Sequence, residues 1–326
     1  MRISACRHDD SHRERSMVIN MQIIEKTTTF QLNQKSAVAI GKFDGVHLGH
    51  QALLRKIIVQ KERGLLATVF TFDASASAFF GGEGKELTTK KEKRQIFEQM
   101  GVDVLIEFPL NTVTAATEPE EFVRRFLVNQ MKAAYICAGP DLSFGKKGAG
   151  NHALLAYFSE EYDYRVELID KVMAEGSEVS STRVREAVRQ GKMESAASML
   201  GGPYSVNGCV EHGKKLGRRI GMPTANLIPE EDKLLPPNGV YYSRVITKGT
   251  CYKGISNVGC KPTVSDSTAM GVETYLYDFE GDLYGTDIIV QFLAFRRPEK
   301  KFDSVESLKA QLVQDIAAGE KVDLIH

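Results

Sequence analysis

One stretch, residues 40–51 with the sequence IGKFDGVHLGHQ, constrains the fold of this chain more than any other feature. It follows an apolar run at residues 37–40 that is typical of a buried strand. It precedes residues 52–58, whose apolar positions have the spacing of a helix. A strand, a glycine-rich turn and a helix N-terminus together present backbone N–H groups to an anion. The sequence therefore predicts an α/β unit with a phosphate site at this turn.

Two histidines, His47 and His50, stand in this turn three residues apart. In a first helical turn this spacing puts both imidazoles on one face, where they can stabilise the negative charge of a phosphoryl transition state. They could instead be surface residues or part of a zinc site, but no third zinc ligand lies nearby in the sequence. We therefore predict that both are catalytic. The surrounding positions expected to bind phosphate are Gly41, Phe43, Asp44 and Gly45.

Composition and charge narrow the class of protein. The chain has 326 residues, enough for two domains, and its Lys plus Arg equals its Asp plus Glu at 42 each. This balance favours neither nucleic acid nor a membrane as a partner. The five cysteines form no C-x-x-C pair, which favours reduced thiols in a cytoplasmic protein. No apolar run approaches the roughly 18 residues of a membrane span, and the polar residues 1–20 are typical of a disordered extension.

Residues 21–200 alternate strand-like and helix-like segments, which predicts a parallel, Rossmann-like sheet with helices on both faces. In such sheets ligands bind beyond the carboxyl ends of the strands, where the glycine–histidine turn would lie. The expected strands are residues 37–40, 67–71, 102–108, 135–138 and 165–169. The expected helices are near residues 49–63, 90–100, 118–131 and 151–159.

Two further segments are expected at the same edge of the sheet. Residues 138–145, which include Asp141, directly follow the fourth strand. Ser181, Thr182 and Arg185 begin a helix after the last strand. Hydroxyl groups there could simply cap the helix, or together with the arginine they could hold a polyphosphate. The histidine turn in the same domain favours the phosphate interpretation for all four residues.

Residues 201–326 form the second predicted domain. Short β-rich runs at residues 204–211, 239–246, 251–258, 273–277 and 287–295 are separated by glycine and proline. This pattern is typical of a small antiparallel barrel or sandwich. A closing helix is expected at residues 304–317, with Asp303 or Ser304 as its cap.

The chemistry of this domain concentrates in residues 210–227, VEHGKKLGRRIGMPTANL. A glycine-rich basic loop can wrap phosphates with backbone amides, although a solvated basic hairpin would have a similar composition. We expect phosphate contacts from Gly213, Lys214, Gly217, Arg218, Gly221 and Pro223. Residues 223–226 are interpreted as a rigid turn in which Thr224 and Asn226 offer the hard oxygen ligands that suit Mg²⁺. No G-x-x-x-x-G-K-[ST] motif occurs, which excludes an ordinary P-loop kinase.

GKFDGVHLGH, VSSTRVREAVRQGKMESAASMLGGPY and the basic loop resemble the bacterial bifunctional riboflavin kinase/FAD synthetase family over residues 21–326. The resemblance implies that the first domain adenylylates FMN to FAD with release of pyrophosphate. It implies that the second phosphorylates riboflavin to FMN, with ATP and Mg²⁺ used for the phosphoryl transfer. It further implies that Glu273, in the Glu-Thr pair, is the base that takes the proton from the ribityl hydroxyl. The oligomeric state stays open.

The chain departs from the family pattern at a few positions. Residues 72–76 are FDASA where the family has F-D-P-H-P, Leu142 replaces an aromatic residue, and Tyr275 replaces a histidine. The first departure leaves an alternative: a riboflavin kinase whose first domain acts as a flavin- or nucleotide-binding regulatory module. A nucleotidyltransferase of another pathway would leave the second domain without a role. A nucleic-acid-binding regulator disagrees with the balanced charge.

Overall fold

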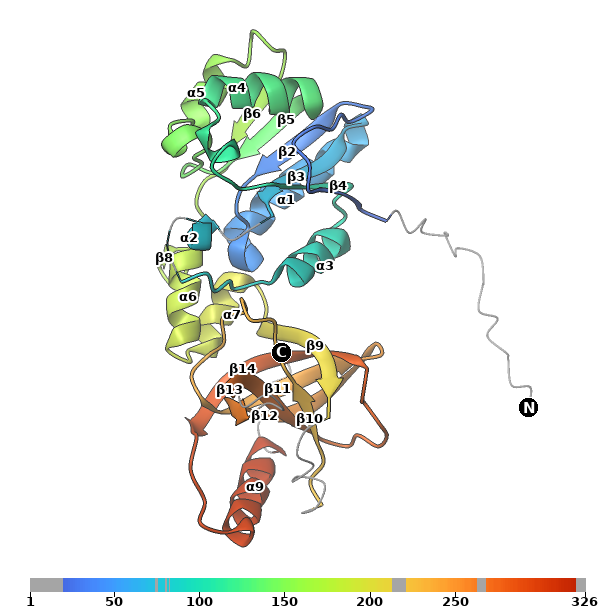
Figure 1. Cartoon of the computed structure of the whole chain (residues 1–326), viewed down its shortest axis with the longest axis vertical. Coiled ribbons are helices and arrows are strands. Elements are labelled where there is room, and N and C mark those ends of the chain that lie inside the picture. The colour runs from blue at the N-terminus through green and yellow to red at the C-terminus, as the bar shows by residue number, and fades with distance from the viewer. Residues whose placement is uncertain are drawn as a thin grey trace, which may run out of the picture.

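A computed structural model describes residues 20–73, 76–79, 81, 83–212, 221–262 and 268–320. An α/β domain and a barrel lie end to end in Figure 1, with α6 (Ser181–Arg189) and α7 (Met193–Leu200) between them. Both expected architectures are therefore confirmed.

The first domain is built on a six-stranded parallel sheet with the order β1-β4-β3-β2-β5-β6. The strands are β1 (Gln22–Glu25), β2 (Ser36–Ile40), β3 (Leu66–Phe72), β4 (Val104–Phe108), β5 (Ala133–Ala138) and β6 (Arg165–Leu168). The order reverses at β2, because β3 pairs with one side of it and β5 with the other. The glycine–histidine turn follows β2 and so lies at the reversal point, where such sheets bind ligands. The edge strand β1 was missed by the sequence analysis.

Helices cover both faces of this sheet, as the alternation predicts. In β2, Val38 and Ile40 face a core with Phe126, whereas Ala37 and Ala39 face a core with Leu54 of the first helix. The helices are α1 (Leu48–Val59), α2 (Ala76–Phe79), α3 (Lys90–Met100), α4 (Pro119–Glu121) continuing as the π-helix η4 (Phe122–Gln130), and α5 (His152–Tyr157). The strand register therefore alternates side chains between the two layers.

The second domain is a closed antiparallel barrel with the order β10-β13-β12-β11-β14-β9. Its strands are β9 (Tyr204–Glu211), β10 (Thr224–Leu227), β11 (Gly239–Thr247), β12 (Thr250–Pro262), β13 (Thr268–Leu276) and β14 (Asp287–Pro298). The interpretation of residues 223–226 as a rigid turn was wrong. Their backbone instead enters the sheet as β10, which pairs with β13 on one side and β9 on the other.

The closing helix α9 (Val305–Glu320) lies on the outside of the barrel (Figure 1). Ser304 caps it, since the Ser307 N–H donates to Ser304 Oγ at 3.1 Å. Asp315 of this helix is fully buried and accepts hydrogen bonds from Arg296 and Arg297 of β14. Burial raises the pKa of the Asp315 carboxyl, but the two arginines outweigh this effect and the net shift is downward.

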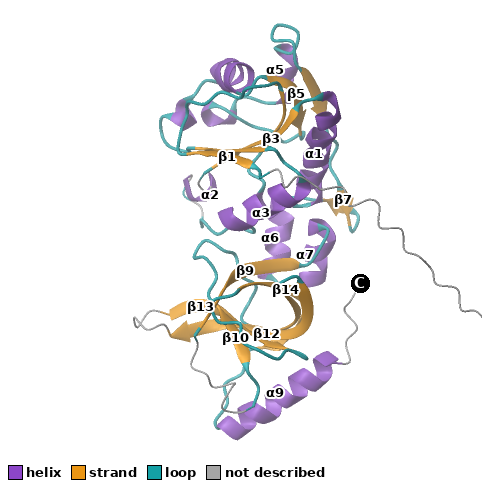
Figure 2. Ribbon diagram, turned by 90° about the vertical axis from the view of Figure 1, so that its right-hand side faces the viewer, coloured by secondary structure: helices purple, strands orange, loops and turns teal. Residues whose placement is uncertain are grey.

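Helices α6 and α7 share a hydrophobic core with the barrel. Val184 and Val188 of α6 and Met199 of α7 pack in one cluster with Val206 and Phe292 of the barrel. Figure 2 shows both helices between the sheet and the barrel strands β9 and β14. Helices α6 and α7, which follow the sheet in the chain, therefore form part of the surface against which the barrel packs.

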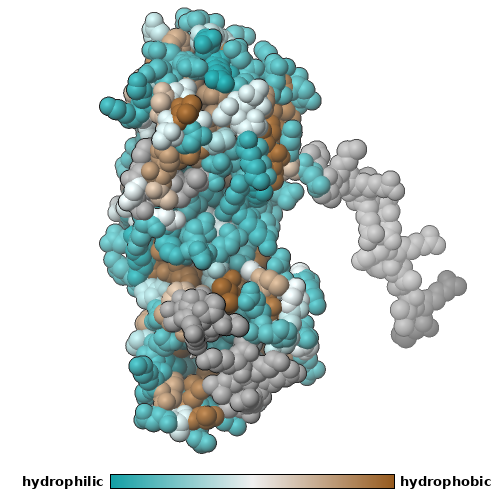
Figure 3. Space-filling view, in the orientation of Figure 1, coloured by the Kyte–Doolittle hydropathy of each residue, from teal (hydrophilic) through white to brown (hydrophobic). Residues whose placement is uncertain are grey.

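The surface shown in Figure 3 is largely hydrophilic, with hydrophobic residues in small separate patches. Across the part of the chain that the structure describes, every helix is too short or too polar to span a bilayer. The four cysteines in that part, Cys137, Cys209, Cys251 and Cys260, are free thiols.

Candidate active sites

The turn after β2 has an unusual backbone. Phe43, Gly45 and Val46 all lie in the left-handed region, with φ of 50°, 81° and 41°. Only glycine adopts this region without cost. A Cβ at Gly45 would also lie 2.8 Å from Leu87 Cδ1, so both its conformation and its neighbour require glycine.

The two predicted catalytic histidines lie together at the N-terminus of α1. Their rings stack with centroids 3.7 Å apart and 20° between the planes. His47 is the N-cap of α1, and its Nδ1 accepts from the His50 N–H at 3.4 Å. Gly49 permits this packing, because a Cβ there would lie 3.2 Å from His47 Cε1. His50 Nδ1 is buried and has no hydrogen-bond partner among the described residues.

Burial keeps both imidazoles neutral. It lowers the pKa of His47 to about 4 and that of His50 well below its usual value, where the neighbouring His47 adds to the effect. An anion bound beside the rings would oppose this shift, because opposite charge favours the protonated imidazole.

We expect the stability of the protein to fall as the pH is lowered through the acidic range. The usual pKa of histidine is 6.5 and that of His47 in the fold is about 4. Between these values the unfolded chain binds a proton that the native state does not, so acidification favours unfolding by up to ~3 kcal/mol from this residue. Urea unfolding between about pH 7 and pH 4 measures the effect. His47→Asn keeps a capping side chain but does not titrate. An unchanged pH slope in this variant would contradict the assignment.

Asp44 connects this turn to α6. Its Oδ2 lies 2.7 Å from Nη2 of Arg185, and its backbone oxygen accepts from Ser181 Oγ at 2.8 Å. Burial raises the pKa of the Asp44 carboxyl, and Arg185 opposes that shift. Thr182, one residue on, is exposed. Ser180, rather than its neighbours, caps α6 by accepting from the Arg183 N–H at 3.3 Å.

The other predicted site residues of the first domain, Gly41 and Asp141, lie next to residues other than the histidine pair. Gly41 directly follows β2, and a Cβ there would lie 3.2 Å from the ring of Phe43. Asp141 follows β5 at the same edge of the sheet, but its side chain is exposed and pairs with Lys171 at 3.1 Å. The structure therefore brings Asp44, Ser181 and Arg185 together with the histidine turn, and it leaves Asp141 pointing to a different partner.

In the barrel, strand register brings the predicted base beside a predicted metal ligand. Asn226 of β10 is directly opposite Glu273 of β13. Asn226 is 8% exposed, and Glu273 is partly exposed. Thr224 lies two residues before Asn226, on the same face, opposite Tyr275. Thr224, Asn226 and Glu273 therefore share one surface of the sheet.

The row of polar residues extends beyond these three. Asn257 of β12 is the other cross-strand partner of Glu273, and Glu211 of β9 is the other partner of Asn226. Neither residue was predicted from the sequence. Their strands, β9 and β12, are far apart in the sequence. Only the strand register of the barrel, in which β10 lies between β9 and β13, shows that Glu211 is next to Asn226 and Asn257 is next to Glu273.

The basic loop is described only at its end. Gly221 and Pro223 are exposed and lead into β10, and Gly221 has a φ of 81°. The predicted phosphate ligands Gly213, Lys214, Gly217 and Arg218 lie outside the described residues.

The donor set on this face fits a magnesium ion. A threonine hydroxyl and an amide oxygen are hard ligands, and Mg²⁺ commonly takes few protein ligands because substrate phosphates and water supply the others. A cluster of three or more His, Cys, Asp or Glu residues, which softer or more tightly held metals prefer, is absent from the described part of the chain.

An α/β domain with a glycine–histidine turn at the reversal point of its sheet, joined to a small barrel with a row of polar residues, is the architecture of a two-domain transferase. The FAD synthetase family model matches residues 29–183, and the riboflavin kinase family model matches residues 200–322. The chain belongs to the bifunctional riboflavin kinase/FMN adenylyltransferase family. The relatives carry both activities, so the interpretation of the first domain as a regulatory module alone is not favoured.

Relatives of that name are similar over almost their whole length. The protein from Listeria monocytogenes is 36% identical over 89% of this chain and 93% of its own. The one from Bacillus subtilis is 34% identical over 86% and 90%, and the one from Haemophilus influenzae is 35% identical over 88% and 94%. A crystal structure titled macrolide-efflux protein from Streptococcus pneumoniae has the same fold, with a TM-score of 0.82 and 29% identity over 93% of this chain and 100% of that one.

Proposed function

We propose that the barrel phosphorylates riboflavin to FMN and that the α/β domain then transfers AMP from ATP to FMN, forming FAD. The observation that carries the proposal is the cross-strand pair of Asn226 and Glu273, which puts a hard oxygen ligand beside a carboxylate. The stacked pair of His47 and His50 at the reversal point of the sheet supports the second reaction.

In the kinase reaction, the basic loop would bind ATP, and Thr224 and Asn226 would hold the Mg²⁺ that accompanies it. The ion would neutralise charge on the transferring phosphoryl group. Glu273 orients the ribityl hydroxyl and accepts its proton as the oxygen attacks the γ-phosphorus and the bond to ADP breaks. Asn257 is the cross-strand neighbour of Glu273 on its other side, and its amide donates to Glu299 Oε1 at 3.3 Å. Positioning supplies much of the rate in such transfers.

In the adenylyl transfer, a phosphate oxygen of FMN attacks the α-phosphorus of ATP and pyrophosphate leaves. His47 and His50 donate hydrogen bonds to the α-phosphate as its charge grows. Thr182, exposed at the N-terminus of α6, contacts the leaving phosphates directly. Ser181 and Arg185 act on the nucleotide from the same helix end, where they already hold Asp44.

The substrates, the charge balance and the thiols together indicate the partners and the compartment of the enzyme. Riboflavin, FMN and ATP are small molecules, and the balanced charge offers no basis for a nucleic-acid or membrane partner. Free thiols at Cys137, Cys209, Cys251 and Cys260 suit a reducing compartment, so we place the enzyme in the cytoplasm.

The test follows the products in time. Purified protein is incubated with riboflavin, ATP and Mg²⁺, and riboflavin, FMN and FAD are separated by chromatography. We expect FMN to appear first and FAD to follow. Accumulation of FMN without FAD, even when FMN and excess ATP are added, would contradict the adenylyltransferase assignment. It would leave a riboflavin kinase whose first domain does not make FAD.

A further inference from the structure

A buried ion pair joins the two domains close to the histidine turn. Lys233 follows β10 in the barrel domain, and Glu92 lies in the first turn of α3 in the α/β domain. Lys233 Nζ and Glu92 Oε2 are 2.6 Å apart, and the two side chains are 1% and 4% exposed. The other Glu92 oxygen accepts from the Asn207 N–H of β9 at 3.0 Å. Because desolvation offsets most of the attraction in such a pair, its larger effect is on geometry.

The same lysine holds a short segment that we call the strap, residues 86–89. Lys233 Nζ donates to the Leu87 carbonyl oxygen at 2.7 Å. The backbone of the strap is also bonded to the barrel, since Glu86 N–H donates to Asp232 O at 2.6 Å and Leu234 N–H donates to Glu86 O at 2.8 Å. One side of the strap is thus fixed to the barrel domain.

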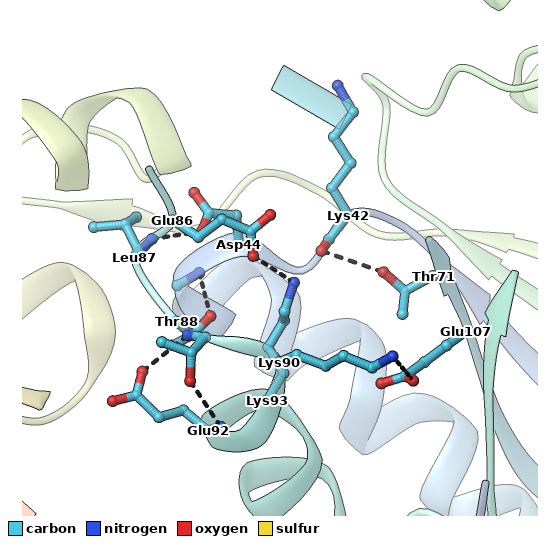
Figure 4. A network of polar contacts seen from close by, with 12 residues as sticks. Lys42, Asp44, Thr71, Glu86, Leu87, Thr88, Lys90, Glu92, Lys93 and Glu107 are labelled. Atoms are coloured by element: carbon cyan, nitrogen blue, oxygen red, sulfur yellow. Dashed lines mark hydrogen bonds and ion pairs between the residues drawn. The ribbon is translucent and has the colours of Figure 1, made fainter. Parts of the chain in front are cut away.

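The other side of the strap holds the phosphate-binding turn (Figure 4). The Leu87 N–H donates to Asp44 Oδ1 at 2.8 Å, and Thr88 Oγ1 accepts from the Gly45 N–H at 3.1 Å. Leu87 is fully buried, and its side chain lies where a Cβ on Gly45 would be. Both backbone groups of Leu87 are therefore in use, one toward the barrel and one toward the turn.

We propose that Lys233 of the barrel domain is a positioning residue for adenylyl transfer, acting through the strap on the turn that carries His47 and His50. The proposal rests on the adenylyltransferase function proposed above. A shift of Leu87 would move Asp44 and Gly45, which lie three and two residues before His47 in the chain. A displacement of about 1 Å at a reacting centre can cost about a hundredfold in rate. The two domains are thus one unit for FAD synthesis, although their reactions are separate.

The test measures both reactions on each full-length variant. Lys233→Met removes the cation, and Lys233→Met combined with Glu92→Gln also removes the buried unpaired carboxylate, which protects folding. We expect kcat for FAD formation from FMN to fall about ten- to a hundredfold in both, with the KM for FMN little changed. We expect riboflavin phosphorylation to stay within about twofold. Lys91→Met is the control, because Lys91 pairs with Asp287 across the same interface at 3.3 Å and is exposed.

Each outcome decides the proposal. A selective fall in kcat for FAD formation, absent in the control, supports it. Normal FAD formation in the variants, or a parallel loss of both reactions, overturns it, because a merely structural lysine would affect both or neither. If the wild-type protein makes no FAD, the proposed function itself fails, and if His50→Ala makes FAD normally, the proposed role of the histidines fails. If those two behave as expected and only the Lys233 variants do not, the inference alone fails.

Discussion

Glu273→Gln is expected to lower kcat for riboflavin phosphorylation by about a hundred- to ten-thousandfold, the range for loss of a general base. Glutamine has nearly the same shape and can still contact the hydroxyl group of riboflavin, but it cannot accept its proton. The KM values for riboflavin and ATP should therefore change little. Steady-state kinetics with each substrate varied would measure the split between kcat and KM.

Two controls test whether the effect is specific to Glu273 and to the kinase reaction. Glu280→Gln changes an exposed glutamate just beyond β13 and should leave the kinase activity unaltered. FAD formation from added FMN should persist in Glu273→Gln, because that reaction uses the other domain. Equal changes in kcat and affinity, or no change in either, would show that Glu273 is not the base.

The second large effect is expected in the first domain. His50→Ala should reduce the rate of FAD formation from FMN and ATP by about a hundred- to a thousandfold, as for the loss of one donor to a developing charge. His50 stacks on His47 at the N-terminus of α1, with ring centroids 3.7 Å apart, and this position is the basis of the expected effect. The rate would be measured as pyrophosphate released or FAD formed.

His152→Ala is the matched control for this variant. His152 is a histidine at the start of α5 in the same domain, and it is not part of the proposed site. Its replacement should leave FAD formation near the wild-type rate. The kinase activity of His50→Ala, measured on the same sample, reports whether the chain has folded. Near-normal FAD formation by His50→Ala would overturn the proposed mechanism.

Local patterns were sufficient to predict most of the secondary structure. Helix α3 has the bounds that the sequence predicted, and the structure shows that both ends are fixed locally, by a capping box of Thr89 and Glu92 and by Gly101 in the left-handed conformation. The strands β2 to β6 were each predicted within two residues of their observed bounds. The exception is β1 (Gln22–Glu25), a short edge strand whose residues are partly or fully exposed, so it has no strong apolar signal.

Strand β10 shows where such patterns fail. Its sequence, TANL, has a proline before it and little β propensity, and it resembles a turn. It is a strand because β13 and β9 supply partners on both sides. The pairing of Asn226 with Glu273 depends on this strand, so that contact could not have been predicted from the sequence.

The sequence by itself determined the two domain types, the glycine–histidine turn with His47 and His50, and the choice of Glu273 through its family motif. These features depend on residues close together in the chain or on a family pattern. Only the tertiary structure decided that Arg185 pairs with Asp44 and that Lys233 reaches the strap beside the turn. Contacts between distant segments depend on how packed elements exclude water and satisfy buried charges, and a linear pattern contains no record of that geometry.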